Sequence, residues 1–185
     1  MAKTRKPDPA APPPTAQRLT EQLRGLRLPA FRDHFQGQAE RAARENLSYP
    51  QYLEALTNRE CETRAQGRIR RLATASRLPT GKTWDQFRWS RLPKTAQQQF
   101  QALRDGAFLA RRENILVFGK PGSGKTHALC AVTEQLVLQG RAVLFASCSL
   151  LVQELLAAKR DLELERFLKK LAGFEALLID DLGYV

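Results

Sequence analysis

Eight consecutive residues in the second half of the chain have the types and spacing of a phosphate-binding loop. They read Gly-Lys-Pro-Gly-Ser-Gly-Lys-Thr and occupy positions 119–126. In the pattern G-x-x-x-x-G-K-[ST], the glycines let consecutive backbone N–H groups turn toward phosphate oxygens. A short apolar run at 114–118 precedes the loop and a helical pattern follows it, so the loop should join a strand to a helix N-terminus. This context indicates a nucleotide-binding site.

The residues of the loop would have distinct roles toward a nucleotide. The ammonium group of Lys125 would reach the β- and γ-phosphates, and the Thr126 hydroxyl is a hard oxygen ligand that suits Mg²⁺. We therefore expect ATP and Mg²⁺ as cofactors. The residues expected to bind the nucleotide are Gly119, Lys120, Pro121, Gly122, Ser123, Gly124, Lys125, Thr126 and His127.

Two aspartates, Asp180 and Asp181, follow an apolar run of strand length near the end of the sequence. If the strands are parallel, their carboxyl ends meet at one edge of the sheet, which would also carry the phosphate loop. We expect Asp180 to hold Mg²⁺ through water beside Thr126, and Asp181 to polarise the water that attacks the γ-phosphate. Two aspartates alone would merely end a strand, but the loop upstream favours the metal site.

Alternating strands and helices should position both motifs. Helical patterns at 149–160 and 162–174 separate the apolar runs, and Ser147 or Ser149 would cap the first of these helices. The strands expected are 114–118, 142–146 and 176–180. The second half of the chain is therefore predicted to be an α/β core with a parallel sheet.

The first part of the chain differs in charge and in pattern. Residues 1–112 contain 22 Lys and Arg against 10 Asp and Glu, whereas residues 113–185 contain 8 against 9. This excess of positive charge suggests nucleic acid or an acidic protein surface as a partner. Leucines three and four residues apart predict helix, and Ser48 with Gln51 forms a capping box for a further helix.

Three arginines in that helix, Arg64, Arg68 and Arg71, fall at positions i, i+4 and i+7 and so share one face. A row of guanidinium groups can follow a nucleic-acid backbone, so we expect sequence-independent DNA contact here. The alternative is a solvated basic face or one that meets an acidic protein.

A junction follows the helical part. Thr-Gly-Lys-Thr at 80–83 resembles the tail of a phosphate loop, but Ser76 stands where the first glycine is required, so we predict a turn. Thr95 should cap a helix that continues to Phe108. The aromatic side chains expected to pack at this junction are Trp84, Phe87 and Trp89.

Several classes of protein are excluded by the remaining composition. No run approaches the roughly 18 apolar residues of a membrane span, and the proline-rich start lacks the apolar centre of a secretory signal. Three cysteines without CxxC spacing favour a cytoplasmic protein with reduced thiols over a zinc site. The predicted domains are a disordered arm at 1–17, a basic helical domain at 18–80, a connecting segment at 81–112 and the nucleotide-binding core at 113–185.

Taken together, these motifs resemble the IstB-like transposition helper ATPases, which are related to the DnaC-type helicase loaders of the AAA+ group. The segments that carry the resemblance are LRLPAF, LSYPQYLEAL, ENILVFGKPGSGKTHA, SLLVQELL and LLIDDLGY. The resemblance implies an AAA+ ATPase that couples ATP binding and hydrolysis to DNA and to a transposase, and that forms a homo-oligomer. In the family's terms, the phosphate loop is Walker A and the strand before Asp181 is Walker B.

The resemblance further implies a sensor strand and an arginine finger after Walker B, and the sequence ends before them. We therefore expect a C-terminally truncated core that binds ATP and has little turnover. One alternative is a non-enzymatic basic module that binds DNA or protein, and another is a kinase for a small substrate. DNA binding that is unchanged in Lys125→Ala would support the non-enzymatic module. Phosphoryl transfer to a metabolite would support the kinase.

Overall fold

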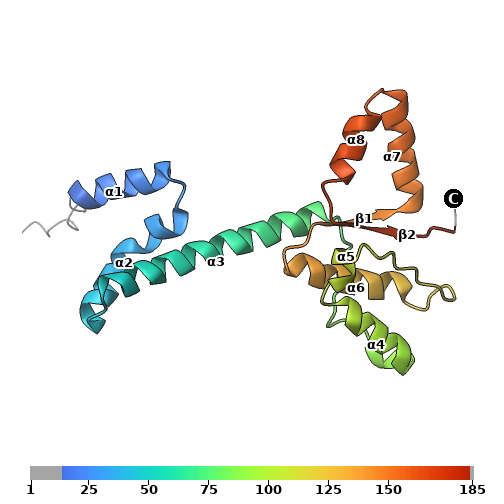
Figure 1. Cartoon of the computed structure of the whole chain (residues 1–185), viewed down its shortest axis with the longest axis horizontal. Coiled ribbons are helices and arrows are strands. Elements are labelled where there is room, and N and C mark those ends of the chain that lie inside the picture. The colour runs from blue at the N-terminus through green and yellow to red at the C-terminus, as the bar shows by residue number, and fades with distance from the viewer. Residues whose placement is uncertain (1–13, 184–185) are drawn as a thin grey trace, which may run out of the picture. The chain divides into compact units, whose positions relative to one another are not determined.

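The computed structural model describes residues 14–183, which are mostly helical and carry a small parallel sheet (Figure 1). The helices are α1 (Pro14–Gly25), α2 (Pro29–Glu45), α3 (Tyr49–Ala75), the 3-10 helix η1 (Trp89–Arg91), α4 (Lys94–Leu103), α5 (Ala107–Ala110), α6 (Lys125–Leu138), α7 (Cys148–Arg160) and α8 (Leu164–Leu171). The strands are β1 (Val143–Ser147) and β2 (Ala176–Asp180). Among the described helices, none is long and apolar enough to cross a membrane.

Contacts divide the chain into two compact units, Met1–Gln66 and Gly67–Val185. The division falls within α3, whereas the sequence pattern placed the end of the helical domain at residue 80. At the other end, α1 begins at Pro14, inside the segment 1–17 predicted to be a disordered arm. Proline is tolerated there because a backbone N–H in the first helical turn would have no helical acceptor, so its absence costs no hydrogen bond. The rest of that arm, residues 1–13, lies outside the described residues.

The first unit buries one apolar side chain from each of its helices: Leu23, Ala30 and Leu56. The capping box predicted before α3 is confirmed. The Ser48 N–H donates to Gln51 Oε1 at 2.9 Å, and the Gln51 N–H lies 3.5 Å from Ser48 Oγ. These reciprocal contacts satisfy N–H groups that the start of a helix leaves without helical partners.

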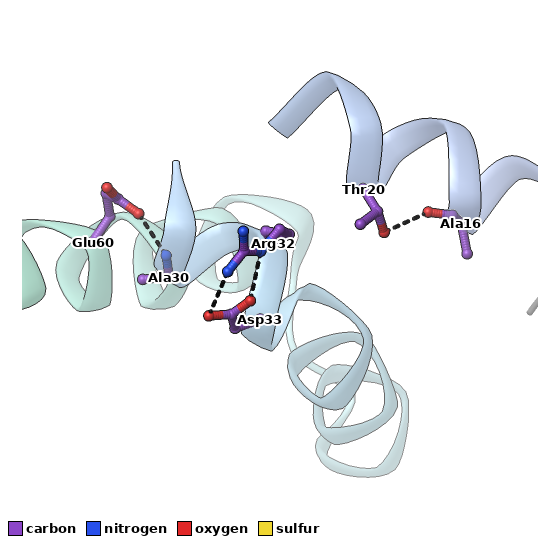
Figure 2. Close-up of polar contacts among 6 residues, drawn as sticks. All are labelled: Ala16, Thr20, Ala30, Arg32, Asp33 and Glu60. Atoms are coloured by element: carbon purple, nitrogen blue, oxygen red, sulfur yellow. Dashed lines mark hydrogen bonds and ion pairs between the residues drawn. The ribbon is translucent and has the colours of Figure 1, made fainter. Parts of the chain in front are cut away.

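A buried glutamate joins α3 to the start of α2. The residue before α2, Leu28, provides no side-chain cap. Instead, the Ala30 N–H donates to Glu60 Oε2 at 2.9 Å (Figure 2), and the other carboxylate oxygen accepts from Arg64 Nε at 2.8 Å. Glu60 is only 4% exposed. Its negative charge therefore caps the positive end of α2 from a neighbouring helix.

The second unit contains the sheet. Strands β1 and β2 pair in parallel, from Val143 opposite Ala176 to Ser147 opposite Asp180. The strands predicted at 142–146 and 176–180 are thus confirmed to within one residue. Ser147 is the cap of α7, because its Oγ accepts the Leu150 N–H at 3.3 Å. Helices α7 and α8 form the connection between the strands and lie side by side (Figure 1).

Helix α6 is the centre of this unit's core. It is apolar around most of its circumference, and its buried side chains pack with Phe100 of α4 and Val143 of β1. The predicted packing role of the junction aromatics is confirmed, since Trp84, Phe87 and Trp89 cover this core. Within the segment 80–83, Thr80 and Gly81 form the predicted turn.

The strand predicted at 114–118 is wrong for this structure. Within residues 14–183 the sheet contains only β1 and β2, which pair with each other. A strand requires a neighbour that satisfies its backbone N–H and C=O groups, and this segment has none. Within this segment, Val117 packs against the core, whereas Leu116 and Phe118 are 67% and 86% exposed.

The helix predicted from Thr95 to Phe108 is also corrected. Helix α4 begins at Lys94 without a side-chain cap, so Thr95 lies inside it and does not cap it. The chain leaves the helical path at Gly106, where φ is 73° and an added Cβ would lie 2.9 Å from the Leu136 side chain. Phe108 therefore belongs to the separate short helix α5.

Candidate functional site

The loop at 119–124 leads directly into the N-terminus of α6. Its last residue, Gly124, has a φ of 88°, a left-handed conformation that side chains other than glycine rarely adopt. At Gly119, an added Cβ would come within 3.1 Å of Ser123 Oγ. The N–H groups in the first turn of α6 have no helical acceptors. The loop is thus compact, and it ends where an anion is favoured.

The ammonium group of Lys125 is held over this loop. Its Nζ donates to the carbonyl of Gly119 at 2.8 Å and to that of Lys120 at 3.1 Å. A phosphate group would be a stronger acceptor because it is charged. If Lys125 were to bind an anion, its ammonium group would have to give up these two hydrogen bonds to carbonyl oxygens.

Thr126 and Asp180 lie together although 54 residues separate them. The Thr126 hydroxyl, in the first turn of α6, donates to Asp180 Oδ1 at 2.9 Å. Asp180 ends β2, so the carboxyl edge of the sheet meets the phosphate loop as the parallel arrangement predicts. Both side chains are partly buried. The contact places two hard oxygen atoms, Thr126 Oγ1 and Asp180 Oδ1, next to each other.

Asp181 differs from its neighbour. It follows β2 with a φ of 57°, a conformation that aspartate tolerates better than most residues, and it is exposed. Within residues 14–183, no hydrogen bond or ion pair involves its side chain. The structure therefore brings Thr126 and Asp180 together and leaves Asp181 in water.

The donor set fits Mg²⁺ only if a nucleotide supplies further oxygens. The described part of the chain has no group of three or more His, Cys, Asp or Glu placed to hold a metal ion. Mg²⁺ usually takes one or two protein oxygens together with waters and substrate phosphates. The Thr126 hydroxyl and the Asp180 carboxylate, next to a loop suited to phosphate, match that requirement.

His127 contacts an aromatic ring whose role sequence reasoning missed. Its Nε2 is buried and has no hydrogen-bond partner among the described residues. Its ring meets Phe87 edge-on, with centroids 5.1 Å apart. Phe87 also lies against Gly124, where an added Cβ would come within 3.1 Å of Phe87 Cε2. Because these contacts join residues far apart in sequence, the pattern around Phe87 predicted only packing.

Cys130, one turn beyond Thr126 in α6, is not a nucleophile at neutral pH. Burial raises the pKa of its thiol to about 11, while the charge of Lys82 lowers the pKa and that of Asp180 raises it. Only 1% of the residue is exposed. The thiol therefore behaves as a small apolar side chain.

The three arginines expected to contact DNA are not equivalent. Arg64 pairs with buried Glu60 and also donates to the Arg27 carbonyl at 2.8 Å. Arg68 donates to the Gly140 carbonyl at 3.3 Å. Arg71 is exposed, and no such partner is found for it within residues 14–183. Sequence reasoning missed Glu60, which looks like one more polar residue on a charged helix.

Comparison with known proteins identifies the family. The model of the family described as IstB-like ATP binding protein matches residues 21–185. The chain belongs to this family. It is 39% identical over 169 residues to an insertion sequence ATP-binding protein of Sinorhizobium fredii, covering 91% of this chain and 57% of that protein.

Two further relatives of the IstB-like chain are ATP-binding proteins of named insertion sequences. Identity to the IS5376 protein of Geobacillus stearothermophilus is 31% over 169 residues, covering 91% of this chain and 67% of the relative. Identity to the IS21 protein of Pseudomonas aeruginosa is 32% over 163 residues, covering 88% and 62%. The chain thus spans 57% to 67% of the length of these three relatives.

Proposed function

We propose that this chain binds ATP or ADP with Mg²⁺ through residues 119–126 and serves as an ATP-binding helper in transposition. The observation that carries the proposal is the hydrogen bond between Thr126 and Asp180 at 2.9 Å. It joins the phosphate loop to the acidic end of β2, which is the arrangement a nucleotide and its cation require. The relatives, which are named as ATP-binding proteins of insertion sequences, support the same conclusion.

Each residue of the site has a role in this proposal. Backbone N–H groups of the loop and of the first turn of α6 bind the phosphates. Lys125 moves from the Gly119 and Lys120 carbonyls to the β- and γ-phosphates. Thr126 and Asp180 hold Mg²⁺, the aspartate through water. When bound, the cation neutralises phosphate charge, and Asp181 orients the attacking water.

The proposal extends to DNA, a transposase and a homo-oligomer as partners. Its support is the basic character of residues 1–112 and the family to which the chain belongs. We assign the helical part, 18–80, to DNA or transposase contact, the segment 81–112 to the connection, and 113–185 to an AAA+ core. Of the three arginines, exposed Arg71 is the best placed for phosphate contact, because Arg64 already neutralises Glu60.

The test is a calorimetric titration of the full chain with ATP and Mg²⁺. Wild type should bind, and Lys125→Ala should lose about tenfold or more in affinity, because an ammonium–phosphate contact is a strong charge-assisted interaction. Lys169→Ala is the control, since Lys169 is an exposed lysine of α8. Equal affinity of wild type and Lys125→Ala would show that the loop is not the nucleotide site.

A second arm separates binding from coupling to DNA. Equilibrium nucleotide titrations with and without random-sequence duplex test whether DNA alters nucleotide affinity. Reciprocal coupling requires that ATP alter DNA affinity by the same factor. DNA binding that is the same in wild type and Lys125→Ala, with and without ATP, would support a basic binding module that does not use the nucleotide.

A further inference from the structure

Phe87 lies against the phosphate loop at the two residues that flank Lys125 and Thr126. Its ring edge approaches Gly124, where an added Cβ would meet Cε2 at 3.1 Å and Cζ at 3.6 Å. The same ring meets His127 edge-on at 5.1 Å. One side chain from outside the core domain predicted by sequence therefore contacts both ends of the Lys-Thr pair.

Phe87 is in turn part of a cluster that contains both tryptophans of the chain. It meets Trp89 at 4.4 Å between centroids, and Trp89 lies against Trp84 at 4.1 Å between centroids with the rings tilted by 33°. Trp89 also meets buried Phe100 at 5.7 Å. The Trp89 indole N–H donates to the Trp84 carbonyl at 3.0 Å, so the two tryptophans are fixed relative to each other.

The segment that carries Phe87 is fastened to α6 at a second point. The backbone N–H of Trp84 donates to Glu134 Oε2 at 2.9 Å. Glu134 and His127 are seven residues apart in α6, so they lie on the same face two turns from each other. The segment thus follows one face of the helix that begins at the phosphate loop. A displacement of the first turn of α6 must therefore either move the Phe87 side chain or be prevented by it.

From these contacts we infer that Phe87 is a positioning residue for the nucleotide site, and that it links the state of the loop to the Trp84–Trp89 pair. This inference depends on the proposed nucleotide binding. The Phe87 ring restricts the turn from Gly124 to His127, where the N–H groups that face the phosphates are located. Lys125 must leave two loop carbonyls when phosphate binds, so the loop changes its hydrogen bonds next to this ring.

The experiment combines calorimetry with tryptophan emission. Because the only tryptophans are Trp84 and Trp89, the emission of the full chain reports this cluster alone. Saturating wild type with Mg²⁺ and ATP, which does not itself emit there, should shift the intensity or the wavelength. Phe87→Leu should weaken affinity roughly two- to tenfold, in line with the loss of an aromatic contact. It should also abolish most of the emission change.

Phe108→Leu is the matched control. Phe108 also packs against the core, but it belongs to none of the described aromatic pairs, and it is not among the atoms nearest to the loop glycines. It should leave affinity and the emission change as in wild type. Circular dichroism shows whether each variant is folded. If Phe87→Leu does not fold, Phe87→Tyr retains the ring edge and should retain the emission change.

The outcomes distinguish the inference from the proposed function. If wild type does not bind ATP, the proposed function is wrong. If wild type binds ATP and its emission does not change, the link to the tryptophans is wrong while the site stands. If Phe87→Leu and Phe108→Leu reduce affinity equally, Phe87 contributes only to packing, and the inference is overturned.

Discussion

Replacing Glu60 with alanine should destabilise the first unit far more than replacing an exposed glutamate of the same helix. The carboxylate accepts the Ala30 N–H at 2.9 Å and Arg64 Nε at 2.8 Å, and it is almost fully buried. Losing a hydrogen bond to a buried charged group costs about 1.5–3 kcal/mol. The Arg64 pair adds about 0.5 kcal/mol or less, because the Arg64 side chain is 58% exposed and so largely screened. The expected loss is therefore about 1.5–3.5 kcal/mol.

The pH dependence of Glu60 gives an independent check with a defined sign. Desolvation raises the pKa of Glu60, but hydrogen bonds from Arg64 and from the Ala30 and Phe31 N–H groups outweigh it, so the pKa lies below its ordinary value of 4.5. A lowered folded-state pKa contributes stability that is complete above the unfolded-state pKa and is lost as the pH falls through the folded one. The stability difference between wild type and Glu60→Gln should therefore shrink only below about pH 4.5.

Urea unfolding followed by circular dichroism, combined with hydrogen exchange at the Ala30 amide, measures these effects. Glu62→Ala is the matched control: Glu62 is an exposed glutamate two residues further along α3, and its loss should change stability by about 0.5 kcal/mol or less. Exchange at Ala30 should accelerate in Glu60→Ala and not in Glu62→Ala. Glu60 does not cap α2 if Glu60→Ala and Glu62→Ala have the same stability and the same exchange rate at Ala30. The same conclusion follows if the stability difference between wild type and Glu60→Gln is unchanged well below pH 4.5.

Three further predictions concern the site and the basic unit. Asp180→Asn should weaken ATP binding about 10- to 100-fold in Mg²⁺, as loss of an outer-sphere ligand does, and its ATP affinity should match that of wild type in excess chelator. An equal loss of ATP affinity with and without chelator would argue against a metal role for Asp180. At pH 8 a thiol-reactive reagent should modify exposed Cys61 and leave Cys130 unmodified until the protein unfolds, because Cys130 is buried and its pKa is about 11. Rapid modification of both cysteines in the folded protein would contradict the burial of Cys130. Arg71→Ala should reduce the slope of log affinity against log salt on random-sequence duplex by about 0.9, whereas an unchanged slope would point to a protein partner.

The sequence predicts the parts of this protein that depend on local pattern. The Ser48 capping box requires only neighbours in the chain and is confirmed, and the apolar runs at 142–146 and 176–180 form strands to within one residue. The loop at 119–124 leads into α6 as predicted, but no strand precedes it among the described residues. The contact between Thr126 and Asp180 follows from one additional rule, that parallel strands share a carboxyl edge.

Features that depend on a distant partner could not be predicted in this way. The run at 114–118 has strand composition, but strand formation requires a pairing neighbour that the described residues do not provide. Glu60 and Ala30 are 30 residues apart, and nothing in the pattern distinguishes this carboxylate from the exposed ones beside it. The pairing of Arg64 with Glu60 could not be predicted for the same reason.

The packing of α6 explains why nucleotide binding is better supported than turnover. Seven of its residues are buried, and its apolar surface is held by α4, β1 and the aromatic segment. Its N-terminal residues, including Lys125 and Thr126, are therefore fixed by the core before any ligand arrives, which reduces the entropy lost on binding. Asp181 has no such support: it lies in water after the last residue of β2. A group that must orient water within hydrogen-bond reach of a γ-phosphate needs the same preorganisation as the loop. In the proposed function, binding would therefore depend on α6, the most tightly packed helix of the unit, whereas hydrolysis would depend on Asp181, which the described contacts leave free to move.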